Sequence, residues 1–112
     1  MQKFDYRVPR FSVDLPVQIT VDKSTLAGRC IEISKQGMRL ELLQPLPPGT
    51  CGIASITYQD KTLELNVRVA HARETDGGME FIYKSEKERS AVAHLVAALA
   101  TPRNRLGPVL LN

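Results

Sequence analysis

Hydrophobic and polar residues alternate with a period of two over most of this chain, which is the pattern of half-buried β-strands. The alternation begins within residues 13–21, where Val17, Ile19 and Val21 share one face. It recurs in five further runs, at residues 26–33, 38–42, 51–58, 62–72 and 79–83. The expected fold class is therefore mainly β. A six-stranded antiparallel small β-barrel is favoured over an open sheet, because closure leaves no exposed strand edge.

The breaks between these runs are rich in residues that favour turns. Residues 34–37 (SKQG) end the second run, and we expect Gly37 to supply the positive backbone φ of a turn. Residues 44–50 (QPLPPGT) are expected to form a loop, because three prolines do not fit a central strand ladder. Residues 74–78 (ETDGG) are expected to form a hairpin turn.

The hydrophobic period becomes helical after residue 84. Ser85 and Glu88 have the spacing of a capping box, which marks a helix N-terminus. Residues 85–100 then repeat apolar side chains at helical spacing, and Thr101-Pro102 ends the pattern. The apolar positions are Val92, Leu95, Val96 and Leu99. We expect this one-sided C-terminal helix to pack over the barrel mouth or against a partner.

The length of 112 residues, 43% of them hydrophobic, suits one domain with one core. We expect a flexible basic leader at residues 1–12, the barrel at 13–84, the helix at 85–101 and a flexible tail at 102–112. No apolar run reaches the ~18–20 residues that cross a bilayer, and the first ten residues lack a signal-peptide pattern. A cytoplasmic protein without membrane insertion, either a monomer or a weak dimer, is the expectation.

Composition argues against several functions. A net charge of +3, three Tyr, three Phe and no Trp disfavour a DNA- or RNA-binding surface. His71 and His94 stand apart without metal-ligand spacing, so neither a metal nor a cofactor is expected. Cys30 and Cys51 lie in apolar runs and are expected to be two buried free thiols. Ser34 lacks a nucleophile-elbow motif, so an enzyme is not expected.

Two arginines near the N-terminus could bind an anionic ligand. Pro9 stiffens the backbone between Arg7 and Arg10 in the stretch YRVPRF, which lowers the entropy lost when both guanidinium groups are held in place. A planar guanidinium can bind phosphate oxygens, or the O6 and N7 atoms of guanine, through two hydrogen bonds. The alternative is an ordinary solvated basic leader.

A second polar segment lies at the end of the second predicted strand. Glu32 and Ser34 are two residues apart, so on an extended strand they share an outward face, opposite Ile31 and Ile33 in the core. A carboxylate can accept hydrogen bonds from the N1–H and N2–H₂ groups of guanine, and a hydroxyl can bind a base or a phosphate. The alternative is a polar strand end followed by a turn glycine.

Taken in order, these features resemble the PilZ domain, the bacterial receptor module for cyclic di-GMP. The resemblance covers about residues 4–100 and includes the stretches GRCIEISKQGMRLEL, PLPPGT and GGMEF. It implies that the family's Arg-x-x-x-Arg and (Asp/Asn)-x-Ser-x-x-Gly motifs grip the phosphates and guanine edges of the ligand. Arg10, Ser34 and Gly37 match these motifs, and Glu32 stands at the acid or amide position.

The first arginine of the family motif is replaced by Tyr6, and Arg7 stands one residue further on. The resemblance also implies a base-contacting side chain at the end of the fifth strand, where His71 and Arg73 are the candidates. The full set of predicted ligand-binding residues is Arg7, Arg10, Glu32, Ser34, Gly37 and Arg73.

Two functions are compatible with this sequence. The first is a stand-alone PilZ-like adaptor that binds cyclic di-GMP and passes the signal to a separate, unidentified effector protein, in motility, surface polysaccharide production or adhesion, and so in biofilm formation. The second is a degenerate PilZ-like domain that binds no nucleotide and acts as a constitutive protein–protein interaction module. Tyr6 and Glu32 favour the second function, whereas Arg10, Ser34 and Gly37 favour the first.

Overall fold

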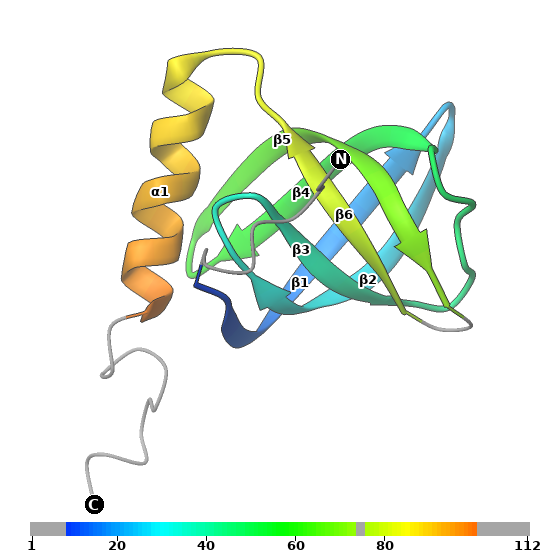
Figure 1. The fold of residues 1–112 in the computed structure, drawn as a ribbon, viewed down its shortest axis with the longest axis horizontal. Coiled ribbons are helices and arrows are strands. Elements are labelled where there is room, and N and C mark those ends of the chain that lie inside the picture. Colours follow the sequence, from blue (N-terminus) through cyan, green and yellow to red (C-terminus); the bar gives the residue numbers. More distant parts are fainter. Residues whose placement is uncertain (1–8, 74–75, 101–112) are drawn as a thin grey trace, which may run out of the picture.

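A computed structural model of the chain describes residues 9–73 and 76–100. Within these described residues, six strands are followed by one helix (Figure 1). The strands are β1 (Phe11–Val21), β2 (Ser24–Ile33), β3 (Gly37–Leu42), β4 (Cys51–Tyr58), β5 (Lys61–Ala72) and β6 (Asp76–Ile82), and the helix is α1 (Glu86–Ala100).

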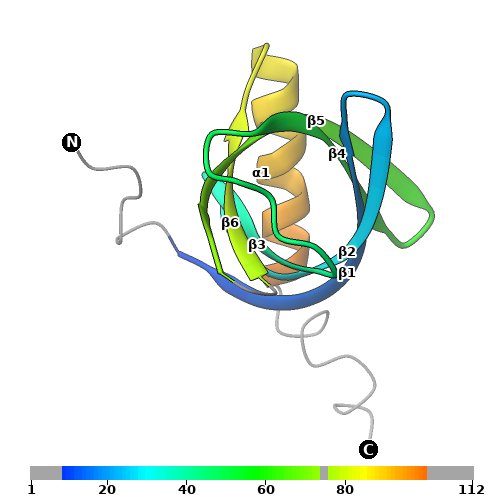
Figure 2. The same ribbon diagram turned by 90° about the vertical axis from the view of Figure 1, so that its right-hand side faces the viewer.

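The strands form a closed barrel in the order β1-β2-β3-β6-β5-β4, and every neighbouring pair is antiparallel. Pairing of β1 with both β2 and β4 closes the ring, which Figure 2 shows from its open end. The predicted fold class, a six-stranded antiparallel barrel with a C-terminal helix, is confirmed. β1 begins at Phe11, earlier than the predicted start at residue 13.

Alternate side chains fill the barrel, as the period of two predicts. In β1 the inward residues Leu15, Val17 and Ile19 are at most 7% exposed. Cys30 is likewise buried, but the prediction that Cys51 is buried is wrong, because Cys51 is exposed. In β4 the even-numbered positions such as Ala54 face the core, so Cys51 falls on the outward face.

The prediction that the glycine pair of residues 74–78 forms a turn is also wrong. Gly77 and Gly78 lie inside β6, where they pair with Ala72 and His71 of β5. A Cβ atom on Gly78 would lie 2.3 Å from the Nε2 atom of His71. The absence of a side chain on Gly78 therefore leaves room for the imidazole ring of His71, which lies against the strand at this point.

The helix begins and packs as its sequence predicts. The Oγ atom of Ser85 accepts a hydrogen bond from the N–H of Glu88 at 3.2 Å, and the Glu88 carboxylate accepts one from the N–H of Lys84 at 2.7 Å. Figure 2 shows α1 across one end of the barrel. Its buried side chains are Val92, Val96 and Leu99, which join the barrel core. Among the described residues, no helix has the length and apolar character that spanning a membrane requires.

Candidate functional site

The turn between β2 and β3 is organised by Ser34. Its Oγ atom accepts hydrogen bonds from the N–H groups of Gln36 at 3.1 Å and Gly37 at 3.3 Å. The N–H of Ser34 in turn donates to the carbonyl of Gly37 at 2.9 Å. The side chain is 6% exposed, so Ser34 does not share the outward face predicted for it and Glu32. β2 ends at Ile33, and the turn directs the hydroxyl inward against its own backbone.

Gly37 is needed for close packing rather than for a positive φ. Among the described glycines, the one with a positive φ is Gly49, at 91°. Gly37 pairs with Glu80 of β6, and a Cβ atom on Gly37 would lie 2.1 Å from the carbonyl oxygen of Met79. The predicted role of Gly37 in the turn is therefore corrected: the glycine lets β6 approach β3.

A β-bulge in β2 directs Glu32 outward. Cys30 pairs with Leu40 and Glu32 pairs with Arg39, so Ile31 is an extra residue on β2. A bulge shifts the alternation of side chains by one position. Cys30 and Ile33 consequently both face the core, whereas Ile31, predicted to be in the core, is only partly buried.

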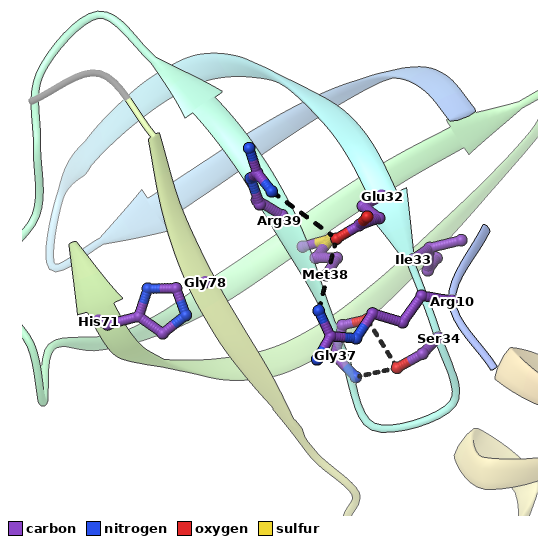
Figure 3. A pocket seen from close by; sticks show the side chains of 9 residues that line it. All are labelled: Arg10, Glu32, Ile33, Ser34, Gly37, Met38, Arg39, His71 and Gly78. Atoms are coloured by element: carbon purple, nitrogen blue, oxygen red, sulfur yellow. Dashed lines mark hydrogen bonds and ion pairs between the residues drawn. The ribbon is translucent and has the colours of Figure 1, made fainter. Parts of the chain in front are cut away.

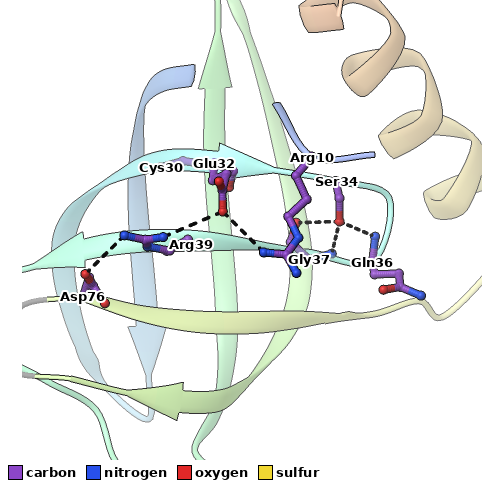
Figure 4. Close-up of polar contacts among 8 residues, drawn as sticks. All are labelled: Arg10, Cys30, Glu32, Ser34, Gln36, Gly37, Arg39 and Asp76. Carbon is purple, nitrogen blue, oxygen red and sulfur yellow. Dashed lines mark hydrogen bonds and ion pairs between the residues drawn. The ribbon is translucent and has the colours of Figure 1, made fainter. Parts of the chain in front are cut away.

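Glu32 lies between two arginines on the outer surface of the barrel (Figure 4). Its Oε1 atom is 3.8 Å from Nη1 of Arg10 and 3.9 Å from Nη1 of Arg39. Arg39 also approaches the carboxylate of Asp76, with 3.8 Å between Nη2 and Oδ2. The side chains of both arginines are close to half exposed, at 44% and 45%. Ion pairs of this kind contribute only about 0–1 kcal/mol each, so a stronger anion can replace Glu32 as their partner.

These side chains surround a pocket of about 270 Å³ (Figure 3). The strand ends of β2, β3, β5 and β6 contribute to it, together with Arg10 just before β1. Its lining residues are Arg10, Glu32, Ile33, Ser34, Gly37, Met38, Arg39, His71 and Gly78. Two guanidinium groups against one carboxylate make the lining suited to an anion, and the His71 ring offers a flat face for stacking.

The thiol closest to Glu32 along the chain is buried. Cys30 is the nearest thiol in the chain sequence, and burial raises the pKa of this thiol to about 12, which keeps it protonated and unreactive. The described residues contain no group of three or more His, Cys, Asp or Glu side chains placed to hold a metal ion.

The pocket brings together four of the six predicted ligand-binding residues, namely Arg10, Glu32, Ser34 and Gly37. Arg73 does not line it; its N–H donates to the carbonyl of Asp76 at 2.7 Å in the β5–β6 connection. Arg7 lies outside the described residues.

Two further side chains with basic groups line the same pocket. One is His71, which the sequence offered as the alternative to Arg73, and the other is Arg39, which sequence reasoning missed. Arg39 stands on the outward face of its strand in the stretch GMRLEL, but only the register of β2 with β3 places it opposite Glu32. The sequence signal that could have identified Arg39 is its position two residues after Gly37, on the outward face of the predicted strand.

Comparison with known proteins settles the family. The model of the PilZ domain matches residues 6–98 of the chain. The chain belongs to the PilZ domain family. No curated protein matches its sequence.

Solved structures agree in fold with this PilZ domain. The PilZ domain of CeSA from a cellulose-synthesizing bacterium is 19% identical with a TM-score of 0.73, and the match covers 81% of this chain and 97% of that one. The Bacillus subtilis inhibitor of motility MotI is 16% identical with a TM-score of 0.68, and the match covers 92% of this chain and 54% of MotI. An uncharacterised Legionella protein is 18% identical with a TM-score of 0.62, over 85% of this chain and 97% of that one.

Proposed function

We propose that this PilZ domain binds cyclic di-GMP at the pocket beside Glu32 and passes the signal to a separate protein, without catalysing a reaction. The observation that carries the proposal is the convergence of Arg10, Glu32, Ser34 and Gly37 on one pocket. These are the positions that correspond to the ligand-gripping motifs of the family. PilZ domains are receptor modules for this dinucleotide, and family membership supports the same ligand here.

Each side chain has a distinct part in the proposed complex. The guanidinium groups of Arg10 and Arg39 bind phosphate oxygens through charge-assisted hydrogen bonds. The carboxylate of Glu32 accepts hydrogen bonds from the N1–H and N2–H₂ groups of one guanine. His71 contacts a base in place of Arg73, because His71 lines the pocket and Arg73 does not. Ser34 and Gly37 act by shaping the turn that holds Glu32 in position.

The proposed ligand extends beyond the pocket toward the N-terminus. A volume of about 270 Å³ lies just below the ~300–1,000 Å³ of typical small-molecule sites. The remainder of the dinucleotide would meet the leader, where Arg7 stands one residue from the family's first arginine. Closure of the leader over the ligand would change the surface offered to a partner, so the signal would pass by a population shift.

The proposed setting is a bacterial cytoplasm, because cyclic di-GMP is an intracellular second messenger of bacteria. The structural similarity to an inhibitor of motility supports motility as one process that such an adaptor could serve. Surface polysaccharide production and adhesion are the other processes that the family implies.

A second candidate function has one specific observation in its favour. Glu32 already lies within 3.9 Å of both pocket arginines, and Tyr6 replaces the family's first arginine. A dinucleotide must displace these ion pairs without an arginine at the first position of the family motif. The second candidate is therefore a nucleotide-free PilZ domain that acts as a constitutive interaction module.

Base selectivity and matched arginine variants test the proposed complex. Arg10→Ala and Arg39→Ala each remove a charged hydrogen-bond donor, so each is expected to weaken cyclic di-GMP binding about ten- to hundredfold. Arg68→Ala is the matched control, because Arg68 is 46% exposed and paired with Glu80, and neither residue lines the pocket. Cyclic di-AMP lacks the guanine N1–H donor and is expected to bind at least about tenfold more weakly. Equal loss in the Arg68 variant, or equal binding of the two dinucleotides, would contradict the proposed site.

A further inference from the structure

A second and larger hollow lies between α1 and the β4–β5 hairpin, away from the arginine pocket. Its volume is about 670 Å³. We call it the helix groove, and its lining residues are Ile56, Tyr58, Gln59, Lys61, Thr62, Leu63, Lys87, Ser90, Ala91, His94, Leu95 and Ala98. Figure 1 shows the β4–β5 turn beside α1, so one wall of the groove is helical and the other is a hairpin.

The groove exists because α1 packs on the barrel through one narrow stripe. Val92, Val96 and Leu99 are buried, and they are spaced three or four residues apart on one helix face. Leu95 and Leu63 on the neighbouring surface pack against the core but stay only partly buried. The floor is consequently apolar and accessible, which is typical of grooves that receive a partner's helix.

The positive charges that line the groove favour an acidic partner. Lys61 of β5 and Lys87 of α1 line opposite walls, and the lining contains no aspartate or glutamate. Neither lysine forms an ion pair with another residue in the described part of the chain. An apolar floor between two lysines is complementary to a helix that carries an apolar stripe flanked by carboxylates.

The length of the groove also suits a helix. The α1 residues that line it extend from Lys87 to Ala98. At ~1.5 Å per residue this wall is about 17 Å long, or three helical turns. An occupant of three turns presents apolar anchors at positions i, i+3 or i+4, and i+7, which is the usual arrangement for helix-in-groove recognition.

The groove and the arginine pocket share a physical connection. The hydroxyl of Tyr83 donates to the carbonyl of Lys35 in the Ser34 turn. On the other side, the guanidinium of Arg89 in α1 lies over the Tyr83 ring, 4.7 Å from its centre. A conformational change in the Ser34 turn can therefore be transmitted through Tyr83 to the N-terminal part of α1, which forms one wall of the groove.

The geometry points to the helix groove as a docking site for an acidic amphipathic helix of a partner protein. This goes beyond the proposed ligand, because it assigns the partner a separate site, and the site is tested without cyclic di-GMP. Leu63, Ala91 and Leu95 contact the apolar stripe of the partner, and Lys61 and Lys87 bind its flanking carboxylates.

Two synthetic helical peptides with the same leucine stripe test the docking site, one with glutamate and one with lysine on its flanks. Each is titrated into the isotope-labelled full-length chain and followed by NMR. The acidic peptide is expected to shift the amide signals of Leu63, Ala91 and Leu95, and the basic peptide to leave them in place. An acidic peptide that moves no groove signal at millimolar concentration, or a basic peptide that binds as well, would overturn the proposal.

Matched helix variants locate the contact. Ala91→Glu places a bulky anion in the groove and is expected to weaken binding of the acidic peptide at least about tenfold. Ala97→Glu introduces the same residue at an exposed position of α1 outside the groove and is expected to leave the affinity unchanged. Equal effects of the two substitutions would contradict docking in the groove.

The charge reversal Lys61→Glu with Lys87→Glu alters only exposed side chains, so it remains informative if Ala91→Glu fails to fold. This double variant is expected to prefer the basic peptide, and an unchanged preference for the acidic one would overturn the role of the lysines. Occupation of the groove by residues 101–112 of the same chain, or by a second copy in a dimer, would also contradict a partner helix. Either would appear in the unliganded protein as contacts to Leu63.

Discussion

At the scale of single residues, Ser34 and Gly37 shape one turn and thereby place Glu32 and Arg39 beside Arg10. The Oγ atom of Ser34 accepts hydrogen bonds from two backbone N–H groups, and Gly37 allows β6 to approach β3 closely. These two motif residues therefore act on the ligand site indirectly, by fixing the structure of the turn. Loss of either residue is therefore expected to affect stability as well as binding.

Ser34→Ala leaves the turn N–H groups of Gln36 and Gly37 without their acceptor. We expect a loss of about 1–3 kcal/mol in the free energy of unfolding, measured by urea denaturation. Ser55→Ala is the control, because the Ser55 hydroxyl makes one exposed hydrogen bond, to Glu64 at 3.4 Å. Its cost is expected to stay within about 0.5 kcal/mol, and an equal cost for the two variants would show that the Ser34 hydroxyl does not hold the turn.

Gly37→Ala forces a Cβ atom against the carbonyl of Met79, a backbone atom that cannot rotate away. The strands β3 and β6 must separate, so we expect a loss of about 3 kcal/mol by thermal or urea unfolding. Gly49→Ala is the control, because a Cβ atom there meets no atom within 4 Å and is disfavoured only by the positive φ of the backbone. We expect it to lower the free energy of unfolding by about 1–2 kcal/mol. A Gly37 variant as stable as the Gly49 variant would contradict the close approach of the strands.

Residue-scale predictions from the sequence were confirmed for the helix cap at Ser85 and failed for the Ser34 turn and where strand pairing decides. The bulge at Ile31 depends on how β2 meets β3, which no pattern in β2 reveals. Arg39 and His71 reach the pocket through the registers of β3 and β5 with their neighbours. Such long-range pairing is not encoded in the local alternation from which strands are predicted.

At the scale of elements, six alternating runs and one helical run were sufficient to predict six strands and a helix. The exception was the start of β6, because a glycine pair after Thr75-Asp76 is typical of a hairpin turn. Gly77 and Gly78 instead continue the strand, and the ring of His71 occupies the space that a side chain on Gly78 would need. A contact between strands thus overrode the local turn preference.

The N-terminus of α1 allows a test of the capping box. Ser85→Ala removes the acceptor for the Glu88 N–H and is expected to lower the free energy of unfolding by about 1 kcal/mol. Ser90→Ala changes an exposed serine inside the helix, where alanine is the better helix former, and is expected to be neutral or slightly stabilising. Denaturation curves that rank the two variants in the reverse order would contradict the cap.

At the scale of the whole molecule, the fold buries the Cys30 thiol fully and the Tyr83 side chain partly, and both groups ordinarily ionise in alkaline solution. Burial raises the pKa of Cys30 from 9.0 to about 12 and that of Tyr83 from 10.0 to about 12. The folded state therefore keeps both protons at a pH where the unfolded state has lost them. The resulting stabilisation is fully present below about pH 9 and is lost as the pH rises toward 12.

The free energy of unfolding is accordingly expected to fall between pH 9 and 12, by at most about 1.4 kcal/mol per pH unit for Cys30. Tyr83 contributes less, because its half-buried hydroxyl is partly screened by solvent. Cys30→Ala is expected to flatten this slope, and Cys51→Ala, which changes the exposed thiol, is expected to preserve it. Urea denaturation at several pH values measures the slope, and an unchanged slope in the Cys30 variant would contradict its origin.

The barrel also joins two surfaces with different proposed tasks. The arginine pocket lies on the outer surface near the β2–β3 turn, and the helix groove lies between α1 and the β4–β5 hairpin. Tyr83 contacts the turn on one side and Arg89 of α1 on the other. An adaptor needs a ligand site and a partner site that sense each other, and this arrangement supplies a short route between them.

The central claim, that the pocket beside Glu32 binds cyclic di-GMP, is tested most directly by calorimetric titration of the full-length chain with this dinucleotide. We expect saturable heat at tens of micromolar ligand, accompanied by a rise in the thermal unfolding midpoint, because a ligand that binds only the folded state stabilises it. The absence of both heat and thermal shift at that concentration would contradict the claim and favour the nucleotide-free interaction module.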